Sequence, residues 1–187
     1  MWSKRQGFSL LELLITLVIV VVLVAMGAPA MTGLLDRMRV EDAVSRWQAD
    51  LTYVRQAAAT YNTIVTVCPV GADSADGADG AGGAGGAEKS CADDWSRGYS
   101  IFMDGDGNGA VNEGDEVLHR RPAVDQRDHT RASDGMTLIR FDTEGFTQTA
   151  GTLVYCPSDV ASELSQGLVI RSTGQTRRAI EAVNCEP

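Results

Sequence analysis

The stretch that decides the fold is KRQGFSLLELLITLVIVVVLVAMGAPAM, residues 4–31. Two basic residues open it, a glycine follows, and an apolar run then continues over residues 8–30 with Glu12 as its only charged residue. At about 1.5 Å per residue, a helix of this length crosses a bilayer. The run also exceeds the roughly 7–15-residue apolar core of an ordinary secretory signal. We therefore expect a transmembrane helix over residues 8–30, with the basic pair on its cytoplasmic side.

Glu12 is the unexpected residue in this apolar run. A carboxylate near the bilayer centre costs about 2.5–3.5 kcal/mol on insertion scales. One interpretation is that Glu12 lies close enough to the cytoplasmic end for its carboxylate to reach the interface. The other is a specific cationic partner, because cleavage after Gly7 would create a free α-amine at Phe8, about 6 Å from Glu12 along a helix axis. The amine of a neighbouring subunit could approach equally well.

The composition restricts the classes of function. The chain has 187 residues, of which 44% are hydrophobic, and a formal net charge of -9. This length predicts one domain with appendages. The acidic balance argues against a generic attraction to nucleic acid or anionic lipid. The two histidines, His119 and His129, lie in no catalytic motif, so we expect no enzymatic activity.

Four cysteines follow the apolar run, and none belongs to a C-x-x-C pair. This spacing argues against a zinc site or a thioredoxin-like motif. In an exported domain two disulfides are the expected outcome, although the sequence leaves three connectivities open. The simplest joins Cys68 to Cys91, which flank a low-complexity segment, and Cys156 to Cys185, which lies near the C-terminus.

An amphipathic continuation of the helix is expected over residues 31–62. Its apolar side chains recur at spacings of four and three residues, which places them in one stripe on a helix. The stripe consists of Val40, Val44, Trp47, Leu51, Val54, Ala58 and Tyr61. The charged residues between them, Asp50 included, predict a solvated opposite face. We expect the stripe to pack on a β-sheet.

Beyond Asn62 the apolar period changes to two, which is typical of β-strands. Short runs of this kind occupy residues 63–68, 99–103, 116–120, 136–141, 151–156, 167–172 and 177–183. Residues 71–87 consist only of Gly, Ala, Asp and Ser, a composition that predicts a flexible loop. We therefore expect an α+β fold in which the helix packs on antiparallel sheet, within a β-rich domain over residues 63–187.

The N-terminal junction closely resembles the leader of type IV pilins and of type II secretion pseudopilins. A short basic leader over residues 1–7 ends in Gly7, Phe8 follows, and Glu12 becomes the fifth residue of the mature chain. The resemblance implies a type IV pilin-like fold, cleavage after Gly7 by a prepilin peptidase and N-methylation of Phe8. It also implies that Glu12 pairs with the N-terminal amine of an adjacent subunit during assembly.

The remainder is similar to the GspH/FimT (FimT/FimU) family of minor pseudopilins. The shared features are a Cys-Pro after the first strand, a W-x-x-G-aromatic step, an Asp/Asn/Gly hairpin and a final Ser-Thr-Gly turn, and they extend to about residue 178. The resemblance implies a non-enzymatic initiator or tip subunit of a type II secretion pseudopilus or a type IV pilus. The implied partners are other pilins and pseudopilins, the prepilin peptidase, the inner membrane and its assembly platform. The implied location is a single inner-membrane span with a periplasmic C-terminal domain.

The segment DGDGNGAVNEGD, residues 104–115, fits the pattern of a calcium-binding loop. The candidate ligands are the side chains of Asp104, Asp106, Asn108 and Asp115 and the backbone carbonyl of Ala110. Strands rather than helices are expected on both sides, and Asp-Gly and Asn-Gly pairs are common in hairpin turns. A plain hairpin is therefore the alternative to a Ca²⁺ site.

A basic turn near the C-terminus raises the question of DNA binding. Some pilus members of the GspH/FimT family bind DNA through a Gly-Arg-x-Arg turn, and the matching residues 174–177 read GQTR, so Gln175 replaces the first arginine. Arg171, Arg177 and Arg178 still predict weak, salt-sensitive phosphate contacts. A DNA-binding pilus subunit is thus the alternative function, and an ordinary solvated hairpin is the simpler interpretation.

Overall fold

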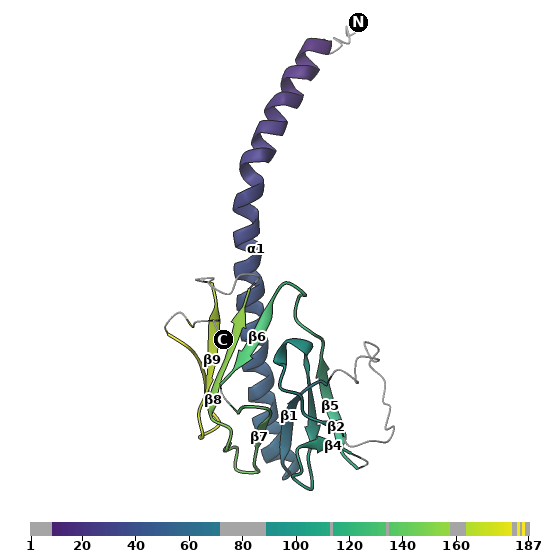
Figure 1. The fold of residues 1–187 in the computed structure, drawn as a ribbon, viewed down its shortest axis with the longest axis vertical. Helices are drawn as coiled ribbons and strands as arrows, with labels where there is room; N and C mark the ends of the chain where they lie inside the picture. The colour runs from purple at the N-terminus through teal and green to yellow at the C-terminus, as the bar shows by residue number, and fades with distance from the viewer. Residues whose placement is uncertain are drawn as a thin grey trace, which may run out of the picture. The chain divides into compact units, whose positions relative to one another are not determined.

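The computed structural model describes residues 9–71, 89–112, 114–133, 135–157, 164–180, 183 and 185. The chain divides into two units, residues 1–38 and residues 39–187. One helix, α1 (Leu10–Tyr61), contributes to both units (Figure 1).

Local backbone chemistry explains where α1 begins and ends. At its N-terminal end the Ser9 hydroxyl accepts a hydrogen bond from the Glu12 N–H at 3.2 Å, as an N-cap does. At its C-terminal end Asn62 has a φ of 51°, the left-handed conformation that commonly ends helices. The Thr63 N–H then donates to the Ala58 carbonyl at 3.2 Å, which satisfies one of the last free carbonyls of the helix.

In the unit formed by residues 1–38, α1 carries large apolar side chains on every side. Between Leu10 and Val24 these side chains are 49% to 79% exposed. Among the residues that the structure describes, no helix is long and apolar enough to cross a membrane. The span expected over residues 8–30 begins outside the described residues and stays a prediction.

In the unit formed by residues 39–187, the C-terminal half of α1 supplies one wall of the core. The expected apolar stripe is at most 6% exposed at Val40, Val44, Trp47, Leu51, Val54 and Ala58. Tyr61 was also expected in the stripe, but its side chain is 55% exposed because the helix ends at this residue. The prediction was also wrong for Asp50, which is 6% exposed because Tyr99 and Arg121 bind its carboxylate.

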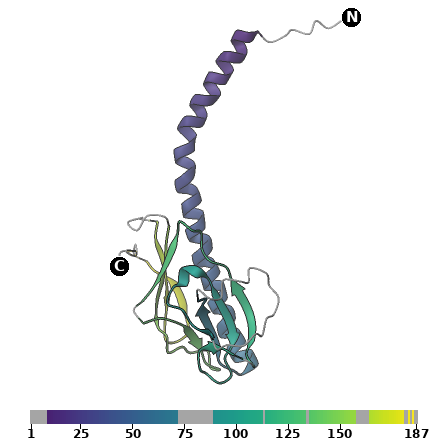
Figure 2. The ribbon, with the colours of Figure 1, turned by 45° about the vertical axis from the view of Figure 1, so that its right-hand side comes forward.

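Within the described residues, antiparallel strands follow α1 and form three sheets. They are β1 (Val65–Pro69), β2 (Lys89–Ser90), β3 (Tyr99–Met103), β4 (Ala110–Val111), β5 (Glu116–Arg121), β6 (His129–Ala132), β7 (Ile139–Phe141), β8 (Gly151–Cys156), β9 (Gln166–Ile170) and β10 (Thr176–Arg178), with a short 3-10 helix, η2 (Trp95–Arg97), before β3. The first four-stranded sheet has the order β5-β3-β1-β7, the second has the order β10-β9-β8-β6, and β2 pairs with β4. Figure 1 and Figure 2 show the four-stranded sheets lying against the C-terminal half of α1.

The strand register brings buried side chains together in front of the helix. Val67 on the central strand β1 pairs with Ile101 of β3 and with Ile139 of β7, and all three are at most 2% exposed. Leu153 of β8 and Leu168 of β9 pair in the second sheet and belong to the same core cluster. A helix packed on antiparallel sheet confirms the expected α+β fold.

The strand expectation failed at the C-terminal end. The run over residues 177–183 was expected to be one strand, but β10 ends at Arg178. Ala179 and Ile180 lie outside any strand, and Ile180 is 88% exposed. The Ala179 N–H still donates to the Gly167 carbonyl at 2.7 Å, in the register of the β9–β10 ladder, so backbone pairing continues for one residue beyond the strand.

Two disulfides fasten the strands to neighbouring segments. Cys68 in β1 is bonded to Cys91, directly after β2, and Cys156 at the end of β8 is bonded to Cys185. These are the pairs expected as the simplest connectivity. The flexible loop predicted over residues 71–87 falls almost wholly outside the described residues, so its character stays a prediction.

Candidate functional site

The predicted assembly site lies at the start of α1. Gly7 and Phe8 are outside the described residues, so the cleavage junction and the new amine are not placed. Glu12 lies in the first turn of the helix, where it is exposed among exposed leucines. The helix dipole favours a negative charge at this end, and a carboxylate in apolar surroundings requires a cationic partner. The role of Glu12 as an assembly contact stays a prediction.

A buried network fastens α1 to the first sheet. The Tyr99 hydroxyl on β3 donates to Asp50 at 2.5 Å, and Arg121 on β5 donates to both Asp50 oxygens at 2.8 and 2.7 Å. Burial alone would raise the pKa of Asp50, but the hydrogen bonds from Arg121 and Tyr99 outweigh it and hold that pKa below its usual range. Burial and the Asp50 carboxylate raise the pKa of Tyr99 far above its usual value. Tyr99 is therefore neutral and Asp50 ionised at neutral pH.

A second network of the same composition fastens α1 to the second sheet. The Tyr155 hydroxyl on β8 donates to Asp128 at 2.6 Å, and Arg39 on α1 donates to the same oxygen at 3.1 Å. The Asp128 side chain is fully buried, whereas that of Arg39 is 26% exposed. Burial and the Asp128 carboxylate raise the pKa of Tyr155. The helix is thus held to each sheet by one arginine–aspartate–tyrosine cluster.

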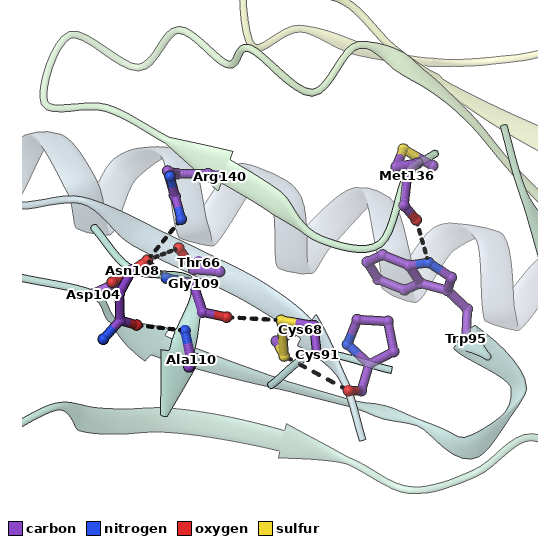
Figure 3. The surroundings of a disulfide bond; sticks show 11 residues. Thr66, Cys68, Cys91, Trp95, Asp104, Asn108, Gly109, Ala110, Met136 and Arg140 are labelled. Atoms are coloured by element: carbon purple, nitrogen blue, oxygen red, sulfur yellow. Dashed lines mark hydrogen bonds and ion pairs between the residues drawn. A yellow bond between two sulfur atoms is a disulfide. The ribbon is translucent and has the colours of Figure 1, made fainter. Parts of the chain in front are cut away.

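A cleft of about 180 Å³ is lined by the arginine and the tyrosine of each cluster, together with Trp47 and Trp95. Among the described residues, its lining contains no histidine, cysteine, serine or lysine. Trp95 is fixed by a hydrogen bond from its ring N–H to the Met136 carbonyl at 3.0 Å (Figure 3). We interpret this cleft as part of the contact region that positions the helix on the sheets.

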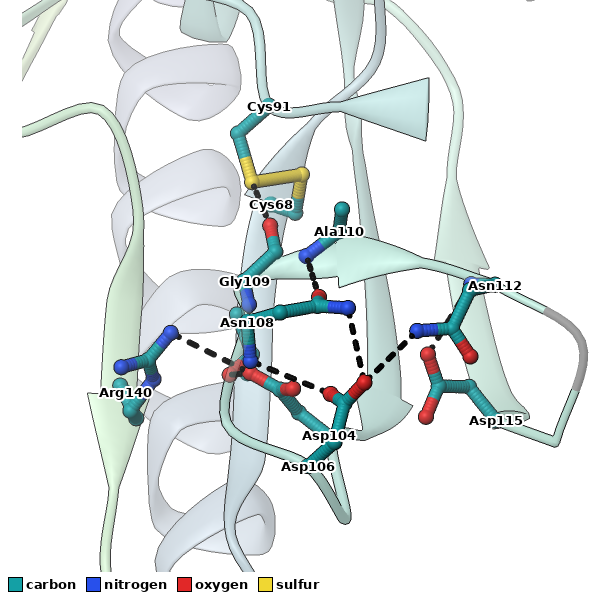
Figure 4. Close-up of polar contacts among 11 residues, drawn as sticks. Cys68, Cys91, Asp104, Asp106, Asn108, Gly109, Ala110, Asn112, Asp115 and Arg140 are labelled. Atoms are coloured by element: carbon teal, nitrogen blue, oxygen red, sulfur yellow. Dashed lines mark hydrogen bonds and ion pairs between the residues drawn. A yellow bond between two sulfur atoms is a disulfide. The ribbon is translucent and has the colours of Figure 1, made fainter. Parts of the chain in front are cut away.

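The predicted calcium ligands start at the end of β3. Asp104 is fully buried, and its Oδ2 accepts hydrogen bonds from the Thr66 hydroxyl at 2.7 Å and the Gly109 N–H at 3.1 Å. Asp106 and Asn108 are exposed and bonded to each other, with the Asn108 side-chain amide 2.9 Å from Asp106 Oδ2. Figure 4 shows the side chains of Asp104, Asp106 and Asn108 gathered inside one turn.

The fourth predicted side-chain ligand, Asp115, does not join this group. Its Oδ2 accepts a hydrogen bond from the Asn112 N–H at 3.0 Å, and β5 begins at the next residue. The physical reason is the following strand, because an extended chain does not turn back toward the loop as the second helix of a calcium-binding hand does.

In the described part of the chain, only His129, Cys156 and Cys185 form a group of three metal-ligating side chains, with ligand atoms within 4.8 Å of one another. The two sulfur atoms are joined in a disulfide, so they are not thiolate ligands. The described carboxylates of residues 104–115, which leave out Glu113, therefore form no three-carboxylate cluster.

The predicted basic cluster lies on the β9–β10 hairpin. Arg171, Arg177 and Arg178 are all exposed. Arg177 and Arg178 are successive residues of a strand and therefore point to opposite faces, and Arg178 donates to the Ser45 hydroxyl of α1 at 2.6 Å. The structure thus does not gather these arginines on one face.

The two arginine–aspartate–tyrosine clusters were not predicted from the sequence. Their members lie 49 and 71 residues apart around Asp50, and no local motif joins them. One signal was available, because Asp50 lies three residues after Trp47 and four before Val54, at the edge of the apolar stripe. An acid at such a position must either reach solvent or find a buried cation.

A long N-terminal helix packed on antiparallel sheet, with one acid in its first turn, defines the class of pilin-like subunits. The family described as type II transport protein GspH matches residues 43–174, and the prokaryotic N-terminal methylation motif matches residues 2–28. The chain therefore belongs to the GspH family. Its family and its structural neighbours are structural subunits of pilin type, not enzymes.

Two crystal structures of the type IV minor pilin FimU from Pseudomonas aeruginosa share this fold. Their TM-scores are 0.56 and 0.53, each at 15% sequence identity. The similarity covers 80% and 78% of this chain and 97% and 99% of the FimU chains. At this identity the likeness shows the fold alone. Among curated protein sequences, none matches the chain.

Proposed function

We propose that the protein is a minor pseudopilin that initiates or caps the short filament of a type II secretion system. It acts as a structural subunit that enters the filament through the N-terminal half of α1. The observation that carries this proposal is the combination of Glu12 in the first turn with exposed apolar side chains from Leu10 to Val24. A surface of this kind requires either lipid or other apolar helices around it.

The proposed assembly contact joins Glu12 to the N-terminal amine of an adjacent subunit. Cleavage after Gly7 by a prepilin peptidase would create that amine at Phe8, and the match of residues 2–28 to the N-terminal methylation motif supports both steps. An ion pair inside an apolar bundle is strong because water is excluded and the local dielectric is low. The intact mass of the membrane-extracted protein tests the processing: it should equal that of residues 8–187 with two disulfides and one N-methyl group in place of a hydrogen. An unprocessed mass would contradict the proposal.

Secretion is the proposed context because the matching family is described as type II transport protein GspH. Deleting the gene should stop release of exoproteins through the outer membrane and leave pilus-dependent surface motility intact. Complementation with the wild-type chain should restore release. The opposite pattern, with loss of motility and normal release, would assign the subunit to a type IV pilus such as that of FimU.

DNA binding is the alternative function, for a pilus subunit used in adhesion or DNA uptake. The exposure of Arg171 and Arg177 supports it, whereas the contact of Arg178 with Ser45 reduces the basic surface. A gel-shift assay with Arg171→Glu and Arg177→Glu combined tests this site. The control is Arg120→Glu, because Arg120 is an exposed arginine of β5. DNA binding that only the hairpin variant loses would favour the alternative, and equal shifts for all three proteins would exclude this site.

A further inference from the structure

The turn between β3 and β4 contains a buried carboxylate whose two oxygens have very different surroundings. Asp104 Oδ2 accepts from Thr66 and Gly109 and pairs with Arg140 Nη2 at 3.3 Å. Asp104 Oδ1 is also buried, yet it has no hydrogen-bond partner within the described residues. A buried carboxylate oxygen that has lost water and gained no donor is costly, so this position favours binding of a hydrogen-bond donor or a cation.

A second carboxylate lies on the same side of the turn. Figure 4 shows the Asp104 carboxyl group facing that of Asp106. The Asn108 N–H donates to Asp106 Oδ1 at 3.1 Å, which fixes the Asp106 carboxylate in this position. Two facing carboxylates repel each other unless a proton or a cation lies between them. Asp106 and Asn108 are exposed, so a cation can reach this place from solvent.

We propose that this turn is a calcium site formed by Asp104 and Asp106. Asp104 Oδ1 and an Asp106 oxygen are its side-chain ligands and water completes the shell, while the Asn108 side-chain oxygen accepts the Ala110 N–H at 2.7 Å and holds the turn in shape. The Ala110 carbonyl stands at the position of the chain that supplies a backbone oxygen in loops of this pattern. The proposal is independent of filament assembly and omits Asp115.

The backbone of the turn supports this assignment. Gly107 and Gly109 have φ values of 72° and 78°, which allow the chain to fold its polar side chains inward. Hydrogen bonds from Gly109 and Thr66 hold Asp104 through Oδ2 and leave Oδ1 free for a cation. The carboxylate is therefore positioned before the cation arrives, which lowers the entropic cost of binding.

The donor atoms favour calcium over other divalent cations. All of them are oxygens, whereas zinc prefers nitrogen and sulfur ligands. Their irregular arrangement suits Ca²⁺, which accepts six to eight ligands, better than Mg²⁺, which requires a near-ideal octahedron. Arg140 weakens the site, since its positive charge lies on the other oxygen of Asp104. We therefore expect a Kd of about 0.1–1 mM, typical of calcium sites in extracellular modules.

The site would fasten several elements together. Thr66 belongs to β1, Asp104 follows β3, and the Gly109 carbonyl lies 3.0 Å from the Cys91 sulfur of the first disulfide (Figure 3). A bound cation would remove the repulsion between Asp104 and Asp106, so calcium should raise the thermal stability of the folded domain.

Isothermal titration of the full-length protein in detergent, with calcium chloride and with magnesium chloride, tests the site. Wild type should show one saturable calcium heat and an unfolding midpoint that rises in about 10 mM calcium but not in equal magnesium. Asp106→Asn should weaken calcium binding at least tenfold, because it removes a carboxylate without disturbing the bonds of buried Asp104. The matched control is Asp125→Asn, an exposed aspartate in a distant turn, which should bind as wild type does.

Two outcomes would overturn the assignment. The first is a folded wild-type protein that shows no saturable heat up to about 10 mM calcium. The second is an Asp106→Asn variant that binds calcium as tightly as wild type does. The indole fluorescence of buried Trp47 and Trp95 reports that each variant is folded before titration.

Discussion

The Tyr99→Phe substitution isolates one hydrogen bond of the cluster that holds α1 to the first sheet. Tyr99 is 5% exposed, and its hydroxyl donates to the Asp50 carboxylate at 2.5 Å. The phenylalanine ring retains the apolar contacts, so the change removes only the hydroxyl. A hydrogen bond to a charged group contributes about 1.5–3 kcal/mol.

The lower part of that range applies here. Arg121 still donates to both oxygens of Asp50 in the variant, at 2.8 and 2.7 Å, so the buried carboxylate keeps a cationic partner. We therefore expect Tyr99→Phe to lower the free energy of unfolding by about 1.5–2 kcal/mol. Asp50→Ala should cost more, about 2–3 kcal/mol, because it leaves Arg121 unpaired, although the 30% exposure of that side chain allows partial hydration.

Urea unfolding of the full-length protein in detergent, followed by Trp47 and Trp95 fluorescence, measures these differences. The control is Tyr53→Phe, since Tyr53 is 43% exposed on the same helix and its change should stay within about 0.5 kcal/mol. In an Asp50→Ala background the additional cost of Tyr99→Phe should nearly vanish, because the hydroxyl has lost its acceptor. A Tyr99→Phe variant as stable as Tyr53→Phe, or an undiminished cost in that background, would refute the reasoning.

Three further predictions concern the same domain. Gly98→Ala should lower the free energy of unfolding by about 3 kcal/mol or more, because the φ of Gly98 is 89° and a Cβ atom would meet the Pro122 backbone carbon at 2.7 Å. The control is Gly105→Ala, which places a Cβ atom in open space and should be nearly neutral in urea unfolding. Replacing Cys156 and Cys185 together by serine should cost about 3–4 kcal/mol, since the bridge closes a sequence separation of 29, and equal stability in urea with and without it would contradict this. The pKa of Asp50 is lower in the folded than in the unfolded protein, so the ionised carboxylate stabilises the fold above about pH 4, and this stabilisation is lost as the pH falls through the lowered pKa. In thermal melts the Asp50→Asn variant should therefore lose less stability than wild type does between neutral pH and pH 3.

The helix and most strands could be predicted because their signal is local. The stripe from Val40 to Ala58 follows the helical period, and runs such as residues 99–103 and 151–156 alternate as strands do. β6 (His129–Ala132) was missed because HTRA has no apolar alternation, and it becomes a strand only by pairing with β8. Its position is set by tertiary pairing, which overrides local propensity.

The candidate site residues also differ in whether a local signal in the sequence could predict them. Glu12 and the cysteine pairs could be identified from the sequence because one has a motif and the others have a simple order along the chain. The burial of Asp50 could not, because its partners lie on strands whose approach depends on the whole sheet. Asp115 does not join the proposed calcium site for a similar reason. The ligand pattern describes a loop followed by a helix, whereas a strand follows this loop.

The recovery of a Glu12→Ala variant in the filament fraction tests the central claim most directly. The control is Glu41→Ala, which removes an exposed acid of the same helix within the globular unit. Both variants should be processed and should remain in the membrane fraction in wild-type amounts, since neither change reduces the apolar surface. Filaments sheared from cells should contain the Glu41→Ala protein and lack the Glu12→Ala protein. Equal amounts of both variants in those filaments would contradict assembly through Glu12.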